Sequence, residues 1–306
     1  MFVQRERVGI PGIEKQRVNA YLFNLPIIRS IHEASVLFVL MLLPAIAGAQ
    51  QVTFSSKAPD VGMTRSAIDT MALVALISVN AEGADQVLDM EQGERKVFSE
   101  TVLATDGNVV TRKRVTVTEA VTRSMQPMQP VTVKSAPATG KTYVIERLDD
   151  SVAVTSEDGA DVTQEERTYM MKEFSGKSES QFNRILEGRT MRVGEELELK
   201  DELLKEFGAG MTDGGLSVRG AKLRLQRLGE RDGVTTAVFD VDITFGGAQG
   251  IMEMEIALNG TAEVGVENLW PFALVMNGTL AGAGSHAGAS LTADGEMQMA
   301  RIATYK

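Results

Sequence analysis

The strongest constraint on this chain is the alternation of apolar and polar residues that runs through its C-terminal part. The alternation is cleanest at 238–245 and 252–258. A strand has this pattern when one face of an antiparallel sheet is dry and the other is wet. Turn-forming residues divide the region into segments, which predict a meander of long strands at 216–228, 235–245, 251–266, 272–281 and 287–304.

Two hairpins are predicted upstream of this meander. The first joins 97–103 to 109–118 at Asp106-Gly107-Asn108, and the second joins 141–147 to 152–155 at a turn around Asp149-Asp150. Residues 124–139 contain three prolines and show no period. We therefore expect a long connection there, which would be the junction if the chain has two sub-domains.

Short helices are predicted between the hairpins and the meander. Thr163 and Glu166 have the spacing of a capping box, in which each side chain accepts a hydrogen bond from a free amide at the helix start. Further helices are expected at 180–186 and 201–207, each followed by a glycine. The predicted fold class is mainly β (α+β), a long antiparallel meander curved into a half-barrel or cradle, with about three short helices.

Two Asn-Gly-Thr tripeptides, at Asn259 and Asn277, interrupt the predicted strands of the meander. Each also matches a glycosylation acceptor, which is a pattern of low information. Asparagine followed by glycine favours a bulge or a tight turn, and we expect one at each position.

An apolar segment near the start of the chain has the outline of an export signal. Residues 36–43 are apolar, Pro44 follows, and Ala47 and Ala49 supply the small residues that a signal peptidase needs. We expect cleavage before Gln50, so that 1–49 is an N-terminal extension and signal peptide and 50–306 is a single β-rich domain. A retained anchor is the alternative, but a spanning helix needs about 20 apolar residues. The predicted location is therefore periplasmic or extracellular, without a retained membrane span.

Composition excludes several kinds of chemistry. The chain has no cysteine, so it has no disulfides, thiolate metal sites, cysteine nucleophiles or lipoprotein acylation site. His286 is the one histidine after the leader and is expected in a loop, which argues against zinc sites of several histidines and against a Ser-His-Asp triad. The formal net charge of −10 disfavours both nucleic acid and anionic lipid headgroups as partners.

Other candidate sites are weak when tested against the residues. Asp240 and Asp242 share a strand face, as do Glu253 and Glu255, and paired carboxylates are what glycoside hydrolysis needs. Acidic residues on the wet face of a sheet also simply keep it soluble. The acidic cluster around Asp158 lacks the spacing of a calcium loop, and 135–142 lacks the first glycine of a phosphate-binding loop. We predict no catalytic, metal or cofactor-binding residues, no cofactor and no enzymatic activity.

The order of features resembles that of uncharacterised exported bacterial β-rich proteins of the cell envelope. The similar phrases are Val102-Leu103 with Asp106-Gly107, Gly140-Lys141-Thr142-Tyr143, Leu186-Glu187-Gly188-Arg189 followed by Val193-Gly194-Glu195, and Ala237-Val238-Phe239. The resemblance implies an exported β-rich fold. It implies no activity and no site.

Three functional hypotheses follow. Fourteen methionines lie after the leader, and methionine fills irregular cores but also lines adaptable apolar surfaces. The first hypothesis is a non-catalytic envelope protein that binds an apolar or amphipathic ligand, such as a lipid, or an envelope protein on a curved sheet. The second is a structural or interaction module without a small ligand. The third, more remote, is a hydrolase that works through carboxylates alone.

Overall fold

The computed structural model describes residues 50–81, 84–107, 109–126, 129–148, 151–174, 181–200, 202–204 and 215–306. Most of these residues lie in strands, whose order is β1 (Gln51–Thr53), β2 (Thr64–Ala81), β3 (Ala84–Asp106), β4 (Val109–Met125), β5 (Thr132–Ser135), β6 (Lys141–Leu148), β7 (Ser151–Ser156), β8 (Thr190–Arg192), β9 (Glu196–Leu199), β10 (Ser217–Arg231), β11 (Val234–Gln249), β12 (Met252–Gly265), β13 (Pro271–His286) and β14 (Ala289–Tyr305). The helices are α3 (Gln164–Phe174) and α4 (Gln181–Leu186), and 202–204 form one more helical turn.

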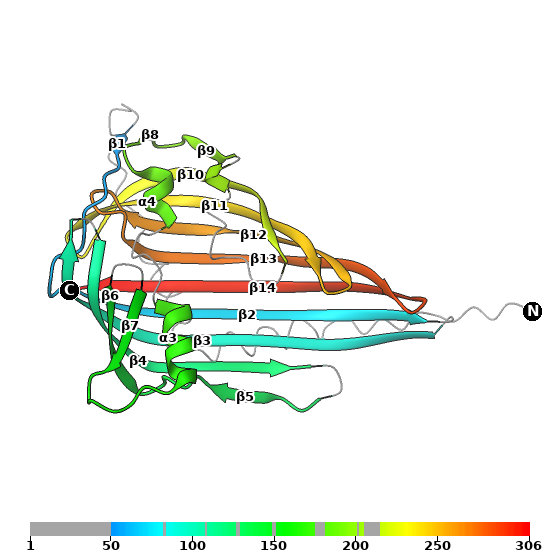
Figure 1. The fold of residues 1–306 in the computed structure, drawn as a ribbon. Coiled ribbons are helices and arrows are strands. Elements are labelled where there is room, and N and C mark those ends of the chain that lie inside the picture. Colours follow the sequence, from blue (N-terminus) through cyan, green and yellow to red (C-terminus); the bar gives the residue numbers. More distant parts are fainter. Residues whose placement is uncertain are drawn as a thin grey trace, which may run out of the picture. The chain divides into compact units, whose positions relative to one another are not determined.

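One antiparallel sheet of 12 strands contains nearly all of the long strands, in the order β7-β6-β4-β3-β2-β14-β13-β12-β11-β10-β9, with β5 on β4. Two meanders, β2 to β7 and β9 to β14, make up the sheet, and they join where β2 pairs with β14 (Figure 1). The strands at the two ends of the order, β7 and β9, are different, so the sheet is not closed into a barrel. The predicted long antiparallel meander is confirmed.

Helices α3 and α4 both lie on one face of this sheet, here called the inner face (Figure 1). Phe174 of α3 packs edge-on against Phe98 of β3, with ring centroids 5.2 Å apart. Ile185 and Leu186 of α4 belong to a second buried cluster with Leu223 and other apolar residues of β10 to β13. Because side chains alternate along each strand, these contacts assign every second residue of β2, β3 and β10 to β14 to the inner face.

The start of α3 has the predicted capping box. The Thr163 backbone N–H donates to the Glu166 carboxylate at 2.8 Å, and the Glu166 N–H donates to the Thr163 hydroxyl at 3.2 Å. Glu166 also binds the Lys141 ammonium of β6. The cap therefore fixes the helix start and ties it to the sheet.

Both predicted hairpins are present as β3–β4 and β6–β7, although Asn108, Asp149 and Asp150 lie outside the described residues. The second predicted helix is α4. Of the third predicted helix, at 201–207, the described part is 202–204, which is helical. Residues 124–139 are not simply a connection, because 132–135 form strand β5 on β4.

The Asn-Gly-Thr tripeptides are neither bulges nor turns, so that prediction was wrong. Asn259 of β12 lies directly opposite Asn277 of β13, and the register is continuous on both sides of them. A side chain at Gly260 or Gly278 would collide with the backbone of the facing strand. Glycine is therefore needed at both positions for the close approach of the two strands, with no break in the ladder.

Candidate ligand-binding face

Part of the inner face is an apolar surface rich in methionine. Through the register, Met71 of β2 lies opposite Met299 of β14, and Leu73 lies opposite Met297. Most of these side chains pack against the core, but all are partly exposed. We call this set the methionine surface; its members are Met71, Leu73, Ile77, Met90, Met252, Met254, Leu291, Met297 and Met299.

Small residues lie between these methionines. Gly278 and Gly282 of β13 are opposite Met297 and Ala293 of β14, and Gly295 is opposite Leu280. The Met254 side chain lies where a Cβ on Gly282 would be. Flexible methionine side chains next to glycine can change rotamer around a ligand at little cost in free energy.

One register step beyond Met71 and Met299, the inner positions of β2 and β14 become charged, and Glu94 of β3 already lies opposite Met71. Arg301 of β14 donates to both carboxylate oxygens of Asp69 on β2, from Nε at 2.8 Å and from a terminal nitrogen at 2.6 Å. Next to Asp69 on β3, the Lys96 ammonium contacts Glu94 at 2.9 Å and Glu173 of α3 at 2.6 Å. We call Asp69, Lys96 and Arg301 the charged row.

The environment favours the charged form of Lys96. Burial alone would lower the pKa of Lys96, but its hydrogen bonds to Glu173 and Glu94 raise the pKa above its usual value. A second group of ion pairs lies nearby, where Glu100 contacts Lys113 and Arg65. Burial alone would raise the pKa of Glu100, but these two cations lower the pKa below its usual value. Lys96 and Glu100 therefore stay ionised at neutral pH.

Tyr169 of α3 borders the charged row. Burial raises its pKa to about 12, and the carboxylates of Glu173, Glu94 and Asp69 add to this effect while Lys96 opposes it. Its hydroxyl is buried and has no hydrogen-bond partner among the residues that the structure describes. A buried hydroxyl without a partner costs free energy, and it is a donor that another group could satisfy.

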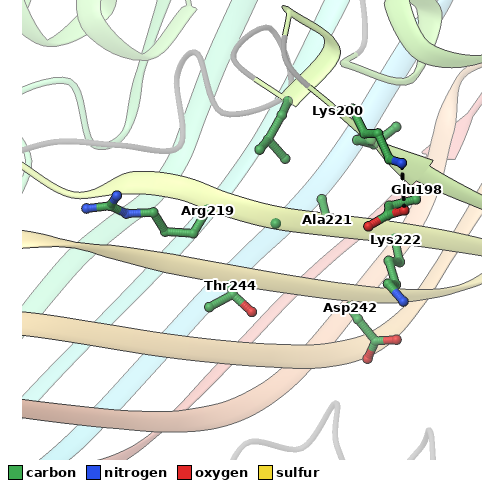
Figure 2. Close-up of a pocket in the computed structure, with 10 residues that line it drawn as sticks. Glu198, Lys200, Arg219, Ala221, Lys222, Asp242 and Thr244 are labelled. Atoms are coloured by element: carbon green, nitrogen blue, oxygen red, sulfur yellow. Dashed lines mark ion pairs between the residues drawn. The ribbon is translucent and has the colours of Figure 1, made fainter.

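A separate cavity of about 420 Å³ lies at the sheet edge where β9, β10 and β11 meet (Figure 2). Charged side chains line much of it, among them Glu198, Lys200, Lys222 and Asp242. Lys200 contacts Glu198 at 3.3 Å, and Lys222 contacts Glu196 at 3.4 Å. The cavity thus combines charges of both signs with Leu199, Leu204 and Ala221. The methionine surface is the more extensive apolar surface, and we take it as the candidate site.

The candidate residues from the sequence do not form one site. Asp240 and Asp242 lie on the outer face of β11, where Asp240 accepts a hydrogen bond from Gln226 at 2.8 Å. Asp242 is opposite Asn259 and Glu255 is opposite Gly246, so the two carboxylate pairs do not converge. His286 is the last residue of β13 and pairs with Ala289, so the loop prediction for it was wrong.

Part of the acidic cluster around Asp158 lies in a hydrogen-bonded turn. Asp158 accepts hydrogen bonds from the Ser156 hydroxyl at 2.6 Å and the Ala160 amide at 3.0 Å, which closes the turn after β7. Across the described ranges, no group of three His, Asp or Glu side chains is placed to hold a metal ion.

The predicted leader, including Ala47 and Ala49, lies outside the described residues. Gln50 is the first described residue, and it is exposed. Among the helices that the structure describes, none has the length and apolar character that a membrane crossing requires.

Comparison with known proteins gives only distant likenesses. No family model matches the sequence, and no curated protein matches it either. A solved structure of lipovitellin, described by its lipid-protein interactions, is 8% identical with a TM-score of 0.35, and the match covers 81% of this chain and 26% of that one. A DUF1329 family protein from Desulfovibrio piger is 10% identical with a TM-score of 0.13, covering 74% of this chain and 83% of the other. At these scores neither likeness supports a functional argument.

Proposed function

We propose that this protein is a non-catalytic carrier or receptor that binds an apolar or amphipathic ligand on the methionine surface. The observation that supports the proposal is a set of partly exposed methionine and aliphatic side chains on β3, β2, β14 and β12, with glycines of β13 lying between β14 and β12. An apolar surface of this kind on a folded protein marks a place where something else binds.

The composition of the methionine surface favours a ligand with a flexible hydrocarbon chain. Each buried methylene contributes about 0.8 kcal/mol, so even partial cover of an alkyl chain gives useful affinity. Methionine side chains adapt to chains of different shape, and the small residues beneath them leave space for that movement. Aromatic platforms, which favour planar or sugar ligands, are absent from the methionine surface.

We also propose that the protein is exported and acts in the periplasm or outside the cell. The support is the leader sequence, with its apolar segment at 36–43 and the small residues Ala47 and Ala49. A carrier of apolar ligands is useful where such molecules must cross an aqueous space.

Native mass spectrometry tests the binding proposal. The protein is expressed from the full sequence and purified, and its mass is compared before and after solvent extraction. We expect an extra apolar mass that extraction removes. Met297→Lys places a charge on the methionine surface and should reduce the bound fraction about tenfold or more, because burying an unpaired ammonium is costly.

Gln298→Lys is the matched control, because Gln298 is the next residue of β14 and lies on the outer face opposite Asn277. It should keep the ligand. A bare mass for the wild-type protein, together with no binding of added fatty acid, would contradict the carrier proposal.

A structural or interaction module is the second candidate function. Strand β9 pairs with residues 221–224 of β10, and the Leu225 backbone bonds to Gly194 and Glu195. Residues 226–231 on that edge of β10 have no strand partner among the described residues. An open edge can add a strand from another protein. Size-exclusion chromatography with light scattering would detect self-association through this edge, and a monomer without any ligand would support neither candidate.

A further inference from the structure

We propose, on the basis of the ligand-binding function above, that the ligand is an anionic amphiphile with a long acyl chain. Its chain lies along β14 on the methionine surface, and its headgroup lies at the charged row beside Arg301. Three observations support this assignment: an abrupt change of chemistry along β2 and β14, the length of the apolar surface, and the hydrogen-bonding state of the charged row.

The change of chemistry occurs within one register step. Met71 and Met299 face each other, and the next inner pair along the same two strands is Asp69 and Arg301. Beyond the charged row, α3 covers the inner face, where Met170 and Phe174 are buried. A ligand on the methionine surface therefore meets charged groups at the α3 end.

The apolar surface is long enough for a whole acyl chain. From Leu291 to Met299 the inner positions of β14 are all apolar or glycine. At about 3.4 Å per residue this stretch is roughly 27 Å long, whereas one leaflet of a bilayer gives a lipid chain about 15 Å. The chain of a common lipid can thus lie extended on this surface.

The hydrogen bonds of the charged row indicate the sign of the headgroup. Both oxygens of Asp69 already accept hydrogen bonds from Arg301, and Glu94 and Glu173 each contact Lys96. The donors are not exhausted, because Arg301 uses Nε and one terminal nitrogen and its side chain is 47% exposed.

The Tyr169 hydroxyl is a further donor, without a partner in the described part of the chain, and its raised pKa keeps it protonated at neutral pH. Unused donors beside satisfied carboxylates favour a ligand that brings acceptor oxygens. The overall negative charge disfavours adsorption to an anionic membrane, but one headgroup at Arg301 interacts with this local cation at short range.

The test compares ligands that differ only in the headgroup. Dissociation constants are measured by fluorescence for a fluorescent long-chain fatty acid and for its methyl ester, with the wild-type protein and with the double variant Arg301→Gln/Asp69→Asn. The double variant removes the cation without leaving Asp69 as an unpaired carboxylate. We expect the wild-type protein to bind the acid about tenfold more tightly than the ester.

In the double variant, binding of the acid should fall to the level of the ester, while the ester should be unaffected. A monoacyl phosphate of the same chain length then shows whether the site prefers phosphate or carboxylate.

Equal binding of acid and ester to the wild-type protein would overturn the headgroup assignment and leave the carrier proposal intact. An equal loss of both ligands in the variant would assign Arg301 a structural role, and no binding of either ligand to the wild-type protein would contradict the proposed function itself.

Discussion

At the scale of single residues, Glu166 stabilises both the start of α3 and the contact of α3 with β6. Hydrogen bonds from Lys141 and from the Thr163 amide lower its pKa to about 2 from a usual 4.5. A carboxyl with a lowered folded-state pKa stabilises the fold fully above its unfolded pKa. That contribution is lost as the pH falls from about 4.5 through about 2.

Glu166→Gln keeps an acceptor for the Thr163 amide but removes the charge that faces Lys141. We expect the variant to be less stable than the wild-type protein by about 1 kcal/mol at pH 7, and the difference to shrink between pH 4.5 and pH 2. Chemical denaturation at several pH values measures this. Glu165→Gln, at the neighbouring exposed position, controls for charge at the helix start. A difference that stays constant down to pH 2 would contradict the assignment.

Residue patterns predicted the capping box because Thr163 and Glu166 are three positions apart. The pair of Asp69 and Arg301 was not predictable, because 232 positions separate them. Only the β2–β14 ladder brings them together, and no local pattern specifies that pairing.

At the scale of elements, β2 is a long strand that sequence reasoning missed. Its segment 71–77 is apolar at every position, so it has no period of two. Such a run is typical of a strand in the middle of a sheet, but periodicity alone cannot separate it from a buried helix. The long strands of the C-terminal meander were predictable because their outer faces carry polar residues.

The position of β2 predicts that its disruption affects both meanders. Ala72 lies opposite Gln298 of β14 and Gly93 of β3, so a proline there removes a ladder hydrogen bond in the centre of the sheet. We expect Ala72→Pro to lower the free energy of unfolding by about 3 kcal/mol or more. Hydrogen exchange should show lost protection in β3 and also in β13 and β14.

Val133→Pro is the control for this variant, because Val133 is in the four-residue strand β5 and is 63% exposed. Its effect should stay within β4 and β5. Lost protection in β3 alone after Ala72→Pro would mean that the two meanders fold independently.

At the scale of the whole molecule, the candidate site depends on register more than on composition. The number of methionines alone could not separate core packing from binding, and packing was the favoured interpretation. The structure places Met71, Met297 and Met299 on one partly exposed face because β2 and β14 pair without a register shift. The charged row depends on the same pairing, so neither part of the site could be found from any single segment.

The whole-molecule proposal of export predicts a shortened chain. The protein expressed from the full sequence in a bacterial host should start at Gln50, and its intact mass under denaturing conditions should be well below 33.0 kDa. Replacing Ala49 by a bulky leucine should block processing, because the peptidase requires a small residue there. The full mass for the unaltered sequence would contradict the signal-peptide prediction.

The pairing of β2 with β14 also constrains how the chain can fold. Strand β14 follows all the other strands in sequence, yet it occupies the middle of the sheet, with contacts such as Ile68 to Ile302. Before β14 is available, β2 and β13 each present an unpaired edge. Contacts between such distant positions form slowly, since a long loop must close first. The central pairing of the sheet can therefore form only after the C-terminal strand has been synthesised.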